Sequence, residues 1–398
     1  MISLGLALVV LVSLAGMAWM IHHNNRTAPR LEQAPPPLAT PKVSVLIPAR
    51  NEAHNLRVTL PLLLQNSYPN WELLVLDDCS EDETADVIAT YSETSNGRLR
   101  SLRGVPLPEG WNGKNWACAQ LADAASGEVL IFCDADVSVG SRAIEQTVST
   151  LQHNGAGILT AVPHQKLLTW SEQAIVPLIM HLSTLGSVPL RHASSSLRES
   201  LTVANGQWLA FSRPVYQSVG GHAAVKASIV EDMVLCKLAK RHGFRVVTVL
   251  AFSQLSVRMY NSFRGIREGF SKNLFGLVKY RWALFLGVGI FFSAVAIAPW
   301  VMPWLDGGLW WLTLAALIGI RIQLASIARH PLSSVFLHPV GSVLLVMVGL
   351  ESLWRTLTHQ LSWKDRTLVR PPQAPPVIVD NAECKEQKAS LLLHKPTG

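Results

Sequence analysis

Residues 43–47 read VSVLI, residues 72–76 read ELLVL, residues 129–133 read VLIFC, and residues 157–162 read GILTAV. Each run has the length of a strand, and helical patterns lie between the runs. Residues 52–66 place leucines at helical spacing, which predicts a crossover helix. A capping box of Ser80 and Glu83 predicts the start of the next helix. The alternation predicts an α/β domain with a mostly parallel sheet and helices on both faces.

Long uncharged blocks flank this domain. Residues 2–21 match the roughly 20 apolar residues that cross a bilayer as a helix. No basic residue precedes them, which favours a membrane anchor over a cleaved signal peptide. Further apolar blocks at 283–302, 309–320 and 333–350 predict membrane helices near the C-terminus.

These patterns divide the chain of 398 residues into successive parts. We expect a transmembrane anchor at 1–21, a Pro-rich linker at 22–41, a catalytic domain at 42–258, a basic interfacial helix at 259–281, membrane segments at 282–360 and a C-terminal tail at 361–398, disordered from about 371.

The net charge of +7 does not indicate nucleic-acid binding, because the basic residues form no dense run with interleaved aromatics. Many of them follow the first apolar block or precede the second. The positive-inside rule therefore places the catalytic domain on the cytoplasmic side of the cell membrane, in a multi-pass protein. The five cysteines are scattered and form no C-x-x-C pair, which fits a reducing compartment.

The topology of the C-terminal segments presents a conflict. Three full crossings from a cytoplasmic domain would leave the basic segment 363–370 outside the cell, against the positive-inside rule. Arg321 interrupts the third apolar block, and Pro339 and Gly341 break the fourth. We therefore expect two full C-terminal crossings, one segment that does not cross, and a cytoplasmic C-terminus.

Carboxylates follow two of the predicted strands. Asp134 and Asp136 come directly after VLIFC, and Asp77 and Asp78 come directly after ELLVL. In open α/β sheets, ligands bind beyond the carboxyl ends of the strands. Paired carboxylates there suit Mg²⁺ or Mn²⁺ with a diphosphate, although a D-x-D sequence alone is equally typical of a solvated acidic turn.

Four segments together resemble glycosyltransferase family 2. They are VSVLIPARNEAHNL, ELLVLDDCSEDET, GEVLIFCDADV and the Val230–Asp232 triplet, in this order, and the resemblance covers roughly residues 42–260. It implies the GT-A fold, a nucleotide-sugar donor, a divalent metal on the diphosphate, and inverting hexosyl transfer.

The resemblance also implies donor-binding roles. The loop after the first strand, with Pro48, Arg50 and Glu52, would bind the nucleotide, and Asp78 would bind the uracil of a UDP-hexose. Asp134 would face the ribose or the metal.

The remaining carboxylates would serve metal and catalysis. Asp136 would be the principal metal ligand, assisted by Asp134. Asp232 matches the family's general base, which takes the acceptor's proton on the side opposite the leaving diphosphate. Without the resemblance, Glu231 and Asp232 read as the acidic first turn of a helix at 231–242.

The segment from Leu107 to Cys118 indicates the class of acceptor. Lys114 would reach the diphosphate, and Trp111 and Trp116 would stack on a base or wall the pocket, or simply be buried in a loop. The string P-E-G-W-x-G-K-x-W-A-C resembles the branch of the family that glycosylates isoprenoid lipids. Within it, carotenoid-acid glycosyltransferases of the 4,4'-diaponeurosporenoate type are most similar, and hopanoid-associated enzymes come next.

A lipid acceptor in a membrane is therefore expected. Glu231, Gln207, His222 and Trp363 are candidates for its side of the site, although a lone histidine is more often structural. Trp363 belongs to a W-K-D-R string, in which Asp365 replaces the glycine of the similar W-K-G-R string in this branch.

Other classes of protein remain open. A processive polysaccharide synthase would carry a Q-x-x-R-W string, in place of which this chain has FRGIR at 263–267. A polyprenol-linked glycosyltransferase differs only in its acceptor. A silent membrane scaffold is the alternative outside the enzymes, and the complete set of acidic residues argues against it.

Overall fold

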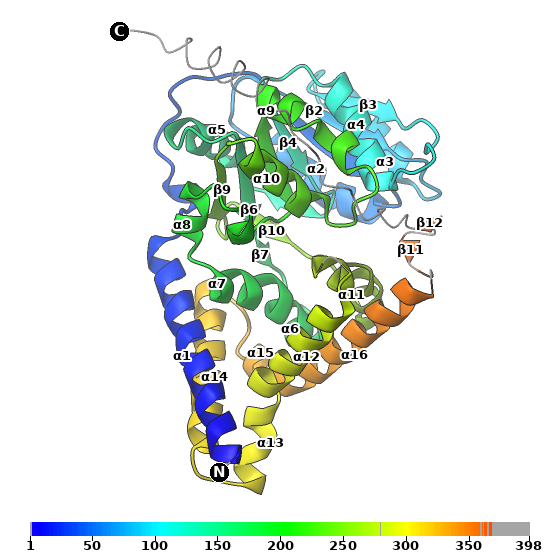
Figure 1. Ribbon diagram of the computed structural model, residues 1–398. Coiled ribbons are helices and arrows are strands. Elements are labelled where there is room, and N and C mark those ends of the chain that lie inside the picture. The colour runs from blue at the N-terminus through cyan, green and yellow to red at the C-terminus, as the bar shows by residue number, and fades with distance from the viewer. Residues whose placement is uncertain (1, 279, 359, 361, 364–365, 368–398) are drawn as a thin grey trace.

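A computed structural model describes residues 2–278, 280–358, 360, 362–363 and 366–367, so the expected disorder from about 371 lies outside them (Figure 1). The central sheet has the order β3-β2-β1-β4-β8-β6-β9. Its strands are β1 (Val43–Ala49), β2 (Trp71–Asp77), β3 (Leu99–Arg103), β4 (Val129–Cys133), β6 (Ile158–Val162), β8 (Trp208–Ser212) and β9 (Val246–Leu250).

Most strand pairs in this sheet are parallel, and only β8 runs antiparallel to its neighbours β4 and β6. Alternate strand residues point to opposite faces, so Val45 belongs to one apolar cluster and Leu46 to another. The helices α2 (Ala53–Leu64), α3 (Thr84–Thr94) and α5 (Ala143–His153) cover the first face. The helices α4 (Gly113–Ala124), α9 (Arg213–Ser218) and α10 (Glu231–Arg241) cover the second. The predicted fold class is confirmed.

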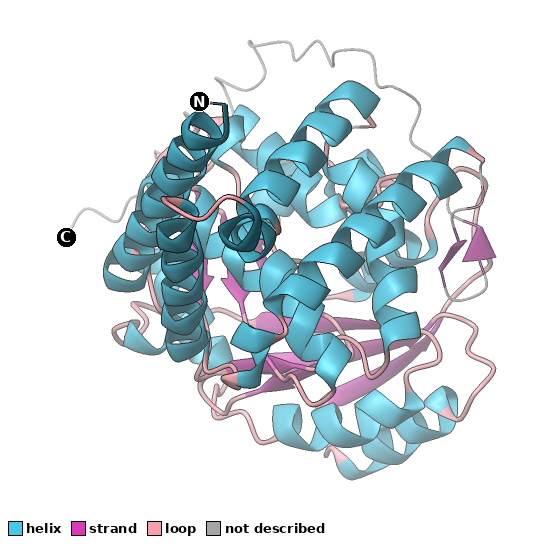
Figure 2. Ribbon diagram, turned by 90° about the horizontal axis from the view of Figure 1, so that it is seen from below, coloured by secondary structure: helices cyan, strands magenta, loops and turns pink. Residues whose placement is uncertain are grey.

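A smaller sheet of β5 (Val137–Val139), β10 (Leu255–Val257) and β7 (His164–Gln165) lies beyond the carboxyl end of β4. It leads into the helical part of the molecule. Figure 2, which views the molecule from that end, shows these helices stacked in front of the strands.

The predicted capping box is wrong. The helix α3 begins at Thr84, later than expected, and its N-cap Glu83 makes no capping hydrogen bond through its side chain. The Ser80 hydroxyl instead accepts a hydrogen bond from the Asn51 amide (2.9 Å). Ser80 therefore ties the loop after β2 to the loop after β1.

The N-terminal helix α1 (Ile2–Thr27) is longer than the predicted span. Asn24 is fully buried, and its amide donates to the carbonyls of Leu185 and Val188 (2.8 Å each). The expected linker is therefore partly helical. Its remainder lies on the catalytic domain, because Leu31 is buried in the core and the Leu250 amide donates to the Pro29 carbonyl (2.8 Å).

Two helical segments lie between the sheet and the C-terminal helices and pack on the latter. The first is a nearly continuous helix of α6 (Trp170–Pro177), a π-helical turn η2 (Leu178–Leu182) and α7 (Ser183–Ser187), followed by α8 (Leu190–Ser195). The second is α11 (Phe263–Leu277), where the interfacial helix was expected.

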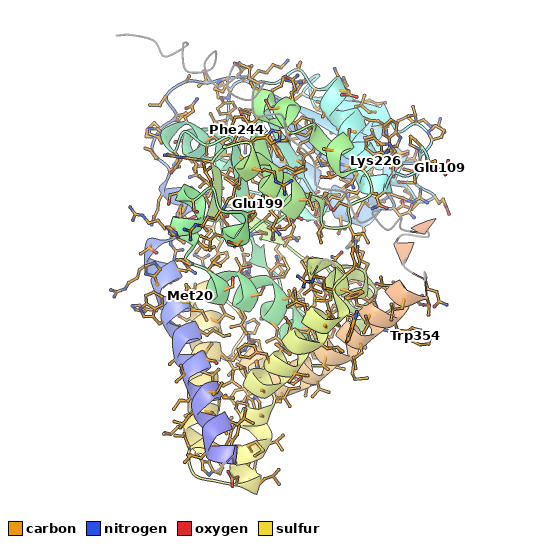
Figure 3. All side chains as sticks on the ribbon, in the orientation of Figure 1. Met20, Glu109, Glu199, Lys226, Phe244 and Trp354 are labelled. Carbon is orange, nitrogen blue, oxygen red and sulfur yellow. The ribbon has the colours of Figure 1, made fainter. Side chains whose placement is uncertain are left out.

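The C-terminal region contains α12 (Trp282–Ala296), α13 (Ala298–Leu305), α14 (Trp310–Ala328), α15 (Ser333–Phe336) and α16 (His338–Leu357). Among the described residues, α1, α14 and α16 are long and apolar enough to cross a membrane, and α11 with α12 meets the same test as a bent pair. Exposed apolar side chains such as Trp354 project outward from these helices (Figure 3).

One sequence expectation about these helices is wrong, and another holds at a slightly different position. Arg321 does not end α14, because its side chain is buried and donates to the Ser334 carbonyl (3.0 Å). The fourth block is broken, but ahead of Pro339: α15 ends at Phe336 and α16 begins at His338. Pro339 occupies the first turn of α16, where the missing amide hydrogen costs nothing. Gly341 lies within the same unbroken helix, against the Ala174 backbone.

Candidate active site

A cavity of about 520 Å³ opens at the carboxyl ends of β1, β2 and β4. Residues proposed from the sequence that line it are Pro48, Arg50, Glu52, Asp78, Lys114, Asp134, Asp136, Gln207, Glu231 and Asp232. They come from segments far apart in the chain because the carboxyl ends of β1, β2 and β4, the start of the antiparallel strand β8 and the first turns of α4 and α10 all lie at this edge of the sheet.

The loops after β1 and β2 are joined to one another. The Arg50 guanidinium donates to the Asp78 carbonyl (3.0 Å) and the Cys79 carbonyl (2.7 Å), and the Asp78 amide donates to the Ala49 carbonyl (2.7 Å). Asp78 is almost fully buried. Arg50 therefore holds the loop that carries Asp78 in a fixed position at the cavity wall.

Lys114 links the two acidic halves of the site. Its Nζ lies 2.8 Å from Asp134 Oδ1 and 3.1 Å from Glu231 Oε1. Burial lowers the pKa of Lys114, but Asp134 and Glu231 outweigh this effect and raise it well above its usual value. Lys114 is therefore a fixed cation between the end of β4 and the start of α10.

The helix α4 sets the position of Lys114. Asn115, the next residue, is buried, and its amide donates to the carbonyls of Val225, Lys226 and Ser228 (2.8–3.1 Å). This contact ties the start of α4 to the loop that precedes α10. No periodic pattern in the sequence signals it.

Asp136 has an unsatisfied oxygen. Its Oδ1 is buried and has no hydrogen-bond partner in the described part of the chain. Burial, followed by Asp134 and Glu52, holds the pKa of Asp136 well above its usual range. A divalent cation would satisfy this oxygen.

The residues fit a metal that the donor helps to hold. No group of three His, Cys, Asp or Glu side chains forms a complete metal site within the described residues. Magnesium typically takes one or two carboxylates and fills its remaining positions with phosphate oxygens and water. Asp134 and Asp136 would supply that number of protein ligands.

Asp232 also lines the cavity, and it belongs to the first turn of α10. Its Oδ1 accepts a hydrogen bond from the Met233 amide (2.7 Å). Burial, and then the charge of Glu231, raise the pKa of Asp232 to about 6. Gly206 lies beside it, and a Cβ at that position would be in van der Waals contact with Asp232 Oδ2, at 3.4 Å.

The other proposed acceptor-side residues differ in position. Gln207 is buried at the start of β8, where its Oε1 accepts hydrogen bonds from Gln165 and Asn205 (3.1 and 3.2 Å). His222 does not line the large cavity. It is buried against Phe132 and hydrogen-bonds to the Tyr216 hydroxyl (2.9 Å), which is a structural role.

Two further sequence proposals fare differently. Trp111 and Trp116 pack edge to face at 5.0 Å and do not line the large cavity, so the suggested stacking on a base or walling of the pocket is wrong. The backbone of Trp363 pairs with that of Arg366 in a short hairpin, β11 (Ser362–Trp363) with β12 (Arg366–Thr367). Asp365 lies outside the described residues.

Tyr260 was missed as a site residue. It lines the cavity, and its hydroxyl occupies the space where a Cβ on Gly269 would lie. Burial, and then Asp136 and Asp134, raise the pKa of Tyr260 above its usual value. No sequence pattern signals this position, because only the fold brings Tyr260 against Gly269.

The comparisons with known proteins agree with this geometry. Residues 44–217 match the family described as "Glycosyl transferase family 2". The 4,4'-diaponeurosporenoate glycosyltransferase of Staphylococcus haemolyticus is 28% identical over 240 residues, 59% of this chain and 61% of that protein. The protein of the same name from Staphylococcus aureus is 27% identical over 237 residues, 58% of this chain and 60% of that protein. The chain thus matches about three fifths of these relatives' length.

One solved structure is similar to this chain in its fold. It is the mannosyltransferase PcManGT from Pyrobaculum calidifontis in complex with GDP-Man and Mn2+, at 18% identity and a TM-score of 0.54. The likeness covers 91% of this chain and 99% of that one. Residues 44–217 of this chain therefore match glycosyltransferase family 2, and the chain has the GT-A fold.

Proposed function

We propose that this chain is a membrane glycosyltransferase that transfers a hexose from a nucleotide-diphosphate donor, with UDP-hexose expected, to a lipid acceptor. A carotenoid acid or another isoprenoid is the expected acceptor, in keeping with the names of the curated relatives. The observation that carries the proposal is the single cavity that brings Asp78, Asp134, Asp136 and Asp232 together.

The donor half of the cavity would hold the nucleotide. Asp78 accepts hydrogen bonds from the base, while Arg50 keeps its loop in place. Lys114 offers a positive charge to the diphosphate. Asp136 and Asp134 would hold the Mg²⁺ or Mn²⁺, which neutralises charge on the leaving diphosphate.

Asp232 would act as the general base. It accepts the proton of an acceptor hydroxyl, or of an acceptor carboxyl that its apolar surroundings keep protonated, while the acceptor oxygen forms a bond to the anomeric carbon and the bond from that carbon to the diphosphate breaks. Attack from the side opposite the diphosphate inverts the configuration. A base with a pKa of about 6 is largely ionised at pH 7 and remains basic enough to accept a proton.

The helices support a membrane arrangement in which α1, the pair α12–α13 and α14 cross the bilayer. They extend away from the sheet side by side (Figure 1). The start of α1 meets the loop before α14, where the Trp310 indole donates to the Ser3 hydroxyl (2.9 Å). We infer that this end lies outside the cell and the catalytic domain in the cytoplasm.

The segment α15–α16 would enter the membrane without crossing it. Ser334 contacts Arg321 in the middle of α14, and His338 contacts Ala296 where α12 meets α13 (3.2 Å). The other end of α16 returns to α11, where Arg267 and Glu351 form an ion pair (2.6 Å). Two C-terminal crossings then leave the C-terminus in the cytoplasm.

The test is a transfer assay on the full chain in lipid nanodiscs. Release of UDP from UDP-glucose should require Mg²⁺ or Mn²⁺ and should disappear in Asp136→Ala. The matched control is Asp123→Ala, which removes an exposed carboxylate outside the cavity. UDP release that persists in Asp136→Ala, or in chelator-treated buffer, would contradict the proposal.

A further inference from the structure

The cavity continues past the reaction centre into a second half that no donor residue lines. One wall is formed by η2 and α7, and the other by α11 and the residues before it. The apolar and aromatic side chains that line this half are Ile179, Met180, Met259, Tyr260, Phe270, Leu274 and Leu277, and the polar ones are Ser183, Thr184, Ser187, Lys272 and Asn273.

The first wall is shaped by the π-helical turn. Such turns insert extra width into a helix and are frequent at functional sites. Here Leu178 and Leu182 pack inward among the membrane-side helices, while Ile179 and Met180 are partly exposed and line the cavity. Ser183 and Ser187, one turn apart, follow on the cavity side. Their small side chains leave space along the wall.

The second wall is held in place by Tyr260. Its ring packs edge to face on Phe270 at 5.3 Å, and its hydroxyl fits against Gly269. The opposite side of α11 packs on α16. The helix α11 is therefore fixed between the catalytic cavity and the membrane-side helices. Its residues Leu274 and Leu277 line the cavity.

We infer that this second half is the passage through which the acceptor's hydrocarbon chain reaches the site from the bilayer. The inference rests on the proposed function. The passage is continuous with the donor cavity, and apolar side chains from both walls line it among polar ones. Its two walls also pack on the membrane-side helices, α7 on α1 and α11 on α16. The basic residues Arg264 and Arg267 on α11 suit the level of anionic headgroups.

The size of the cavity requires an exit for the chain. A volume of about 520 Å³ is that of a site for one small ligand, and the nucleotide-sugar must share it. A long isoprenoid therefore cannot be enclosed. Its polar end lies near Asp232, its first carbons lie between Met180 and Leu274, and the rest remains in the bilayer.

The test uses the full chain in nanodiscs with two probes, a long-chain carotenoid acid and geranic acid, a short isoprenoid acid. Ser183→Trp and Ser187→Trp place a bulky ring on exposed positions of the first wall. Each should raise the KM for the long acceptor at least about tenfold. Ser195→Trp is the control, an exposed serine on α8 that lies outside the cavity.

Donor affinity, measured in parallel by titration with UDP-glucose, separates the two proposals. Both wall variants should bind the donor with the wild-type dissociation constant. Unchanged KM for the long acceptor in both variants would overturn the passage. Wild-type protein that uses geranic acid and the long acceptor equally well would overturn it too, even if the variants failed to fold. Absence of donor binding by the wild type would overturn the proposed function itself.

Discussion

Replacing Asp232 by Asn should reduce transfer and stabilise the protein at the same time. Burial and the charge of Glu231 raise the pKa of Asp232 from 3.8 to about 6. At about 1.4 kcal/mol per pKa unit, this shift corresponds to a destabilisation of up to about 3 kcal/mol for the ionised carboxylate at pH 7. Asparagine has nearly the same shape and no charge, so Asp232→Asn relieves this cost.

The sign of the pH dependence follows from the raised pKa. The folded protein holds the proton more tightly than the unfolded chain, so the stability from Asp232 is present at low pH and is lost between pH 4 and 6. Catalysis depends on pH in the opposite direction, since the base must be ionised. The rate should therefore fall as the pH drops through about 6.

Two measurements check these expectations. Asp232→Asn should lower the transfer rate by roughly two to four powers of ten, remove the acidic limb of the pH profile, and keep donor affinity nearly constant. Thermal unfolding at pH 7 should show a higher melting temperature than the wild type, and the gain should vanish near pH 4. Donor affinity that falls in parallel with the rate would refute the role of Asp232 as the base.

Three other variants test the remaining parts of the site and the topology. Asp136→Ala should abolish metal-dependent turnover and weaken Mn²⁺ binding, measured by electron paramagnetic resonance in the presence of UDP; unchanged binding would exclude it as a ligand. Lys114→Met removes the cation that pairs with Asp134 and Glu231, so Mn²⁺ should bind the donor-free protein more tightly, while UDP-glucose binds about ten to a hundred times more weakly; equal donor affinity would contradict this. A reporter that is active only outside the cytoplasm, fused after Gly398, should remain silent, and a strong signal would mean that all three C-terminal segments cross.

The sheet could be predicted from the sequence because its buried strands are continuous apolar runs. The prediction for VLIFC coincides with β4, and those for the other three runs differ from β1, β2 and β6 by at most two residues at either end. The short edge strand β3 reads LRSLR, which is mostly exposed and carries no comparable signal. Such strands owe their formation to a neighbour's hydrogen bonds rather than to their own composition.

Helix ends were harder to predict, because contacts distant in sequence decide them. Asn24 and Arg321 are polar residues beyond the ends of predicted apolar blocks, yet both lie inside longer helices. Their side chains are buried and donate hydrogen bonds to backbone carbonyls. Ser80 and Glu83 have capping-box spacing, but Ser80 instead bonds to Asn51. Tertiary partners outweighed the local signal in each case.

Part of the candidate site could be predicted from the sequence, and part depends on contacts distant in sequence. Carboxylates that directly follow a strand, such as Asp134 and Asp136, are brought to the cavity by the sheet itself. The bridge from Lys114 to Glu231 depends on how α4 docks against the loop before α10. His222 and Trp111 were misjudged because residue type alone does not tell whether a side chain lines a cavity.

Membranes that contain the protein can be incubated with radiolabelled UDP-glucose, Mg²⁺ and a carotenoid acid, and then extracted with organic solvent. This experiment tests most directly whether the chain glycosylates a lipid at the cavity that holds Asp136 and Asp232. We predict that the label enters an organic-soluble glycolipid, and that Asp136→Ala and Asp232→Asn each abolish this incorporation while Asp123→Ala does not. Label that accumulates in an insoluble polymer, or in glycolipid at the same rate in both site variants, would contradict the account.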